Sequence, residues 1–160
     1  MRMNEERLFY WDKLLRGEGV DLEKVRAMAV RDSTDAPEQE KAAWVLLLAA
    51  AELLKTGSPA SRCYLIAYLR YCFSQAGTAY RPPEFDPESL KGTGIDNVLG
   101  TKLTWEEALI ASSCKSKKGR SVDYSAMKRT EAKLKLACRR WWEELFGSLP
   151  RVLEGGERDG

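Results

Sequence analysis

The segment Ala42–Leu54 constrains the fold of this chain more than any other feature. All of its residues are apolar except Glu52, and alanine and leucine dominate it. Both are strong helix formers, and a helix that is apolar on every side has to be covered by other elements. The run is shorter than the roughly 20 residues of a membrane-spanning helix. The sequence therefore predicts a buried central helix and no membrane partner.

Local signals for helix ends divide the N-terminal half into helices around this segment. Asn4 is expected to cap a first helix that stops near Gly17, and Asp21 to cap a second. The central helix is predicted to open at Asp35 and to end at Gly57.

A fourth helix is predicted to start at Ser58, with Pro59 at its first helical position, and to stop at Gly77. The following residues, 78–103, are rich in proline at their start and in glycine at their end. Connections of this length within a domain tend to be functional or mobile. We predict a long loop here, which either packs on its own bundle or contacts a partner.

Two more helices follow the loop. Thr104 and the glutamate three residues later form a capping box, which predicts the start of a short helix. Ser121 or Asp123 is expected to cap the last and longest helix, which ends at Gly147. The predicted fold is thus an all-α, single-domain bundle of about six helices over residues 1–150, with a disordered tail at 151–160.

Composition argues against most catalytic chemistry. The chain has no histidine, which excludes Ser-His-Asp and Cys-His catalysis and the common zinc sites. Its four cysteines, Cys63, Cys72, Cys114 and Cys138, show no C-x-x-C spacing and are interpreted as small core residues. We expect neither a cofactor nor an enzyme, although carboxylate or lysine chemistry stays open. The charged N-terminus indicates no export, so a cytoplasmic location is expected, or a nuclear one in a eukaryote or virus.

Positive charge is concentrated in one segment, Lys115–Arg140. It contains ten Lys or Arg residues and two acids, a net charge of +8, whereas the whole chain carries +2, so the remainder carries −6. Such asymmetry is typical of a surface that binds a polyanion. Exposed helices are also rich in Lys and Arg for solubility alone, which is the simpler interpretation.

Helical periodicity resolves the last helix into faces. The expected core stripe is Met127, Leu134, Cys138, Trp141 and Leu145. Two basic rows flank the opposite side: Lys128, Lys135 and Arg139 in one row, and Arg129, Lys133 and Arg140 in the other. Leu136 lies between the rows, and Trp142 lies at their edge. There its indole could stack on a base or contact a protein partner, and ordinary partial burial is an equally good interpretation.

These rows predict a non-catalytic protein that binds RNA or DNA through the phosphate backbone, without sequence specificity, as a small subunit of a larger nucleoprotein complex. The candidate binding residues are Lys115, Lys117, Lys118, Arg120, Lys128, Arg129, Lys133, Lys135, Arg139, Arg140 and Trp142. The alternative is a protein-interaction module, such as a viral or phage accessory protein or an inhibitor, whose basic helix docks on an acidic partner.

One short stretch resembles a known family. The run Ser58-Pro59-Ala60-Ser61-Arg62, followed by Tyr64, Leu69-Arg70, Phe73 and Gly77, is similar to the first helix of the DNA-gripping domain of tyrosine recombinases. Those enzymes also require a catalytic domain with histidine, so the resemblance does not imply recombination. In size and helical character the chain is also similar to small helical subunits of RNA-guided effector complexes and to viral matrix domains.

Overall fold

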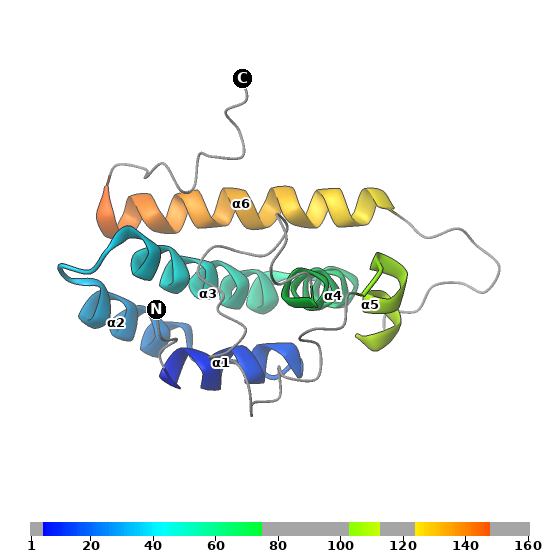
Figure 1. Ribbon diagram of the computed structural model, residues 1–160, viewed down its shortest axis with the longest axis horizontal. Coiled ribbons are helices and arrows are strands. Elements are labelled where there is room, and N and C mark those ends of the chain that lie inside the picture. The colour runs from blue at the N-terminus through cyan, green and yellow to red at the C-terminus, as the bar shows by residue number, and fades with distance from the viewer. Residues whose placement is uncertain (1–4, 75–102, 113–123, 148–160) are drawn as a thin grey trace, which may run out of the picture.

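The computed structural model describes residues 5–74, 103–112 and 124–147, and within these ranges the protein is all-α (Figure 1). Its helices are α1 (Glu5–Leu15), α2 (Leu22–Ser33), α3 (Glu38–Thr56), α4 (Pro59–Ser74), α5 (Trp105–Ala111) and α6 (Tyr124–Phe146). The predicted all-α fold of about six helices is confirmed.

Several predicted helix ends are confirmed by their hydrogen bonds and backbone angles. The Asp21 carboxylate accepts from the amides of the second and third residues of α2, at 3.1 and 3.3 Å. Thr104 and Glu107 form the reciprocal capping box that opens α5. Gly17 and Gly147 follow α1 and α6 with φ values of 79° and 88°, which only glycine adopts at little cost.

The predicted start of the central helix was wrong. Asp35 does not cap α3 but has a φ of 62°, in the left-handed region that aspartate tolerates. Pro37 is the N-cap instead, and α3 begins at Glu38. Proline disfavours a helical conformation in the residue before it, so Ala36 lies outside the helix and the helix starts later.

Some predictions fall on residues that the structure does not describe. These are the Asn4, Gly77, Ser121 and Asp123 signals, the loop at 78–103 except for Leu103, and the tail at 151–160.

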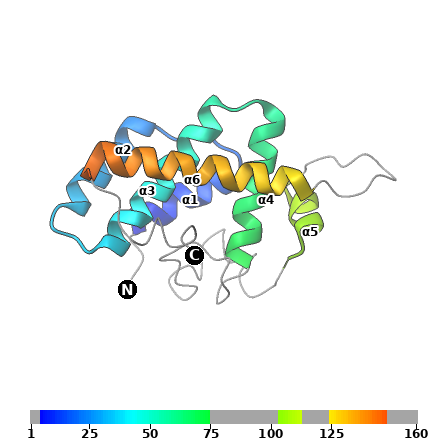
Figure 2. The same cartoon turned by 90° about the horizontal axis from the view of Figure 1, so that it is seen from above.

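α3 is the central helix, as the sequence predicted. It contacts α1, α2, α4 and α6, and the side chains of Trp44, Leu47 and Leu48 are fully buried in the core. α6 runs along one side of the molecule, across α3 and α4, while α1 and α2 lie on the opposite side of α3 (Figures 1 and 2). Among the described residues, α3 and α4 cover the inner face of α6.

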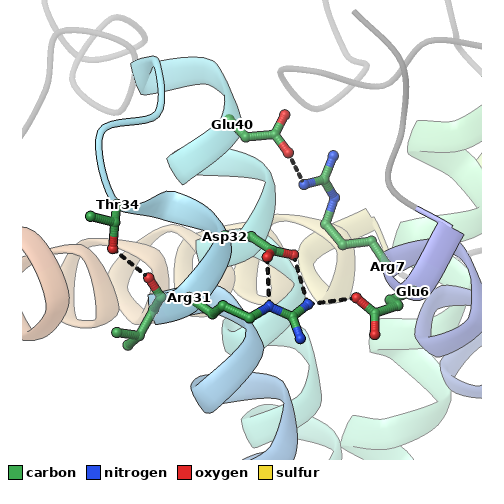
Figure 3. Close-up of polar contacts among 7 residues, drawn as sticks. Glu6, Arg7, Arg31, Asp32, Thr34 and Glu40 are labelled. Atoms are coloured by element: carbon green, nitrogen blue, oxygen red, sulfur yellow. Dashed lines mark hydrogen bonds and ion pairs between the residues drawn. The ribbon is translucent and has the colours of Figure 1, made fainter.

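Charged residues on the far side of α3 are paired with each other (Figure 3). The buried Arg7 guanidinium binds Glu40 and lies over the Trp44 ring, 5.2 Å from its centroid. Arg31 donates to Asp32 and to Glu6, both at 2.7 Å, which joins α2 to α1. These ion pairs hold α1, α2 and α3 together and leave little net charge on that side.

In the ranges that the structure describes, no helix is both long enough and apolar enough to cross a membrane.

Candidate nucleic-acid interface

α6 separates an apolar face from a charged one. Its buried residues are Ala126, Leu134, Ala137, Cys138, Trp141 and Trp142. The predicted core positions Leu134, Cys138 and Trp141 are confirmed, and Met127 and Leu145 are half-buried at the edge of the core. Leu136 is 67% exposed, so its predicted outward position is also confirmed.

Trp142 is not where the sequence analysis placed it. Its side chain is only 3% exposed, and its ring packs edge-on against Phe146 with the centroids 4.8 Å apart. Phe146 in turn lies under the Lys41 ammonium of α3, 5.0 Å away. The indole is therefore covered and cannot stack on a base, because the end of α6 packs against α3 more widely than helical angles alone indicate.

The two predicted basic rows differ in their surroundings. In the first row, Lys128 and Lys135 are exposed and Arg139 is half-buried. In the second row, Arg129 and Lys133 are exposed and line a groove that separates α6 from α4. The four basic residues of the segment 115–120 lie outside the described ranges.

Arg140 has a different role from the rest of its row. Its guanidinium donates to both oxygens of Glu52 in α3, at 2.6 and 3.3 Å, and Glu52 also accepts from the Trp141 indole at 3.0 Å. The hydrogen bond from Arg140 lowers the pKa of Glu52, and the hydrogen bond to Glu52 raises the pKa of Arg140. This pair neutralises Arg140 and fixes α6 to α3.

The C-terminal third of α6 is consequently not basic. Besides the neutralised Arg140 it carries Glu143 and Glu144, both exposed, and Glu144 forms an ion pair of 2.9 Å with Arg26 of α2. The positive charge of the helix is thus confined to the stretch from Lys128 to Arg139.

Within that stretch there is one acid, Glu131. It is half-buried and accepts a hydrogen bond of 3.1 Å from the Tyr68 hydroxyl of α4, so its carboxylate is turned toward the bundle. None of the described residues forms an ion pair with Lys128, Lys133 or Lys135. The outer surface of this part of α6 is therefore strongly cationic.

The groove beside α6 has a volume of about 500 Å³. Its α6 wall comprises Ala126, Arg129, Thr130 and Lys133, and the opposite wall is formed by the end of α3 and the start of α4. In Figure 2 the turn between α3 and α4, which supplies the opposite wall, stands to one side of α6.

The sequence analysis missed the α3–α4 side of this groove. One local signal was available, because the first turn of α4 contains no acidic residue. The first turn of a helix usually favours acids, since its peptide dipoles place positive charge there.

Two of the thiols in the described ranges belong to the core. Burial raises the pKa of Cys72 to about 12, and Cys138 is buried too, as predicted for core residues. Cys63 is half-buried, and Cys114 lies outside the described residues. The described residues contain no group of three or more Cys, Asp or Glu that could hold a metal ion.

Together, the fold and this face define a structural class, that of an all-α protein with a cationic helix face beside a groove. Neither a known family model, nor a curated protein, nor a solved structure matches this chain.

Proposed function

We propose that this protein binds nucleic acid through the phosphate backbone, without catalysing a reaction, and acts as a small subunit of a larger nucleoprotein complex. The observation that carries the proposal is the cationic face of α6. Its five members are Lys128, Arg129, Lys133, Lys135 and Arg139. The one carboxylate in the same stretch is turned toward Tyr68.

The arrangement of these side chains suits a backbone rather than a single anion. Residues 128 and 135 are separated by two helical turns, about 10 Å along the axis. Two rows on either side of a helix face can neutralise successive phosphates of one strand, or phosphates of two strands across a groove. The basic segment 115–120 precedes this face in the sequence and supplies four more cations.

The proposal is tested by charge reversal at matched positions. In the variant Lys128→Glu/Lys135→Glu, we expect affinity for a fluorescent 20-nucleotide strand at 50 mM salt to fall at least about tenfold, because two phosphate contacts are replaced by repulsion. The binding is measured by fluorescence anisotropy for single-stranded RNA, single-stranded DNA and duplex DNA.

The control is Lys13→Glu/Lys24→Glu, which changes the net charge equally but lies in α1 and α2, outside the cationic face of α6. It should bind within about twofold of wild type. Equal losses in both double variants would mean that net charge, and not this face, controls binding. No binding of any nucleic acid by the wild type at 50 mM salt would reject the proposal.

One observation favours a second candidate function. Leu136 is 67% exposed at the centre of the basic face, and Ala132, one turn earlier, is exposed as well. An apolar residue ringed by polar ones has the position of a binding hot spot. The face could therefore dock on an acidic protein surface, and the Leu136 variant discussed below separates the two functions.

A further inference from the structure

The groove beside α6 has the size and the charge of a site for a phosphorylated group. Its volume of about 500 Å³ lies within the usual range of small-ligand pockets, roughly 300–1,000 Å³. Arg129 and Lys133 enter it from successive turns of α6. A guanidinium and an ammonium one turn apart provide the donors that phosphate groups prefer.

The described residues that line the groove include no carboxylate. The nearby Glu52 carboxylate is committed to Arg140 and Trp141. The hydroxyls of Thr56 and Thr130 border the space from opposite helices and donate to the backbone carbonyls of Glu52 and Ala126, at 3.0 and 2.8 Å. An anion in the groove would thus meet the two cations of α6 and, among the described lining residues, no carboxylate.

The start of α4 adds to this environment. Ser58 and Ser61 line the groove, and the Ser58 hydroxyl accepts from the Ser61 amide at 3.2 Å. Gly57 allows the tight turn before α4, because a Cβ at this position would lie 2.8 Å from the Leu53 carbonyl oxygen.

The groove also has an apolar part. Leu53 and Leu65 line it, together with the half-buried ring of Tyr64. Any of the nucleobases can stack on an aromatic side chain, because every base has a flat π-face. Such stacking is a common way for proteins to hold unpaired bases. Cations at one side and an apolar wall at the other match the two halves of a nucleotide.

We propose that this groove holds the terminal nucleotide of a nucleic-acid strand by its phosphomonoester, with Arg129 and Lys133 on the phosphate and Tyr64 against the base. A phosphomonoester carries −1.5 to −2 charges at neutral pH, more than the single charge of a backbone phosphodiester. This inference rests on the proposed function, since the strand follows the cationic face of α6 from the groove onward.

The test compares three 12-nucleotide single strands of one sequence, with a 5′-phosphate, a 3′-phosphate or no terminal phosphate, at 150 mM salt. We expect one of the phosphorylated strands to bind about tenfold more tightly than the unphosphorylated strand. AMP and inorganic phosphate, titrated as competitors, distinguish a nucleotide from a bare phosphate: AMP should displace the strand at lower concentration.

Two substitutions to glutamate separate the groove from the face. Ala60→Glu places a carboxylate at the groove wall, and an acid in the first turn of a helix also favours folding. It should abolish the preference for the phosphorylated strand. Ala132→Glu places the same charge on the exposed side of α6, outside the groove, and should weaken all three strands alike while the preference persists.

Ala60→Gln, of similar size but uncharged, should retain at least half of the preference. Equal affinity of the wild type for all three strands would overturn the groove assignment and leave the backbone proposal standing. A preference that survives in Ala60→Glu would also overturn it. If none of the strands binds at 150 mM salt, the groove assignment is overturned, and binding at 50 mM salt then decides the backbone proposal by itself.

Discussion

Single residues decide which basic side chains are available for binding, and Glu52 is the clearest case. It accepts from Arg140 and from the buried Trp141 indole. A helical wheel predicts that Arg140 is as available for binding as Lys133. It carries no information about the Glu52 carboxylate, which lies 88 residues earlier in the chain. Trp142 was misplaced for a similar reason, since it packs on Phe146, and Phe146 lies under Lys41 of another helix, α3.

Glu52→Ala should lower the free energy of unfolding by about 1–3 kcal/mol, because the Trp141 N–H loses its acceptor inside the protein. Glu52→Gln keeps an acceptor oxygen and should lose less. Both are measured by urea denaturation at pH 7.

The pKa of Glu52 is lowered in the folded state. The stabilisation that its carboxylate provides is therefore complete above the ordinary pKa of 4.5 and is lost as pH falls below that value. The gap between wild type and Glu52→Gln should therefore shrink at pH 3.5, and a gap that is constant with pH would contradict this assignment.

The Cys72 thiol gives a second prediction. Its pKa of about 12 keeps it protonated and unreactive at pH 8, so alkylation of the native protein should modify Cys63 first and Cys72 only in denaturant. Mass spectrometry of the peptides measures this order. Equal alkylation rates at Cys63 and Cys72 would show that Cys72 is accessible.

The same thiol makes stability depend on pH. Between pH 9 and 12 the Cys72 thiol ionises in the unfolded chain but not in the folded protein, so the free energy of unfolding falls as pH rises, by up to about 1.4 kcal/mol per pH unit.

At the scale of elements, helix ends could be predicted because their signals are local. Asp21 and Thr104 accept from amides two or three residues away, so the donor and the acceptor of each capping hydrogen bond lie within one helical turn of each other in the sequence. The exception, Asp35, fails because Pro37 competes with it two residues later. Which helices pack against each other could not be predicted in this way. Periodicity identifies which face of α6 is apolar, but it does not show that α3 and α4 meet beside one basic row and form a groove.

Leu136 tests what the exposed face of α6 does as an element. If the face binds phosphates alone, Leu136→Ala should change the free energy of unfolding by less than about 0.5 kcal/mol and leave oligonucleotide affinity unchanged, as for other exposed positions. We expect this outcome. If the face docks on a protein, truncation should cost roughly 1–2 kcal/mol of partner binding.

The Leu136 experiment compares wild type and Leu136→Ala as baits against the host proteome, with oligonucleotide affinity measured in parallel. Selective loss of one defined acidic protein, at unchanged nucleic-acid affinity, would favour the interaction module over the nucleic-acid proposal. Leu46→Ala, a truncation on a half-buried side of α3, serves as a control for general effects on stability.

At the scale of the whole molecule, charge is distributed unevenly. Around α1, α2 and the start of α3, cations are paired with nearby carboxylates, as Arg7 is with Glu40 and Arg31 with Asp32. The cationic face of α6 lies on the opposite side of α3, and Lys128 and Lys135 have no such partners among the described residues (Figure 1). A polyanion approaching this nearly neutral protein would therefore be oriented toward one face before it makes contact.

This polarity makes salt dependence the most informative measurement on the intact chain. Each neutralised phosphate contributes about −0.9 to the slope of log K against log salt for a duplex and about −0.7 for a single strand. The five cations of the α6 face alone predict a slope of about −4.5 on duplex DNA, and contacts from the segment 115–120 would steepen it. Lys128→Glu/Lys135→Glu should reduce the slope by about 2, whereas Lys13→Glu/Lys24→Glu should leave it unchanged, because only the first pair lies on the contacting face. Anisotropy titrations between 50 and 300 mM salt measure all three slopes. Slopes that decrease equally in both variants would indicate a diffuse response to net charge, and the localised interface on α6 would have to be abandoned.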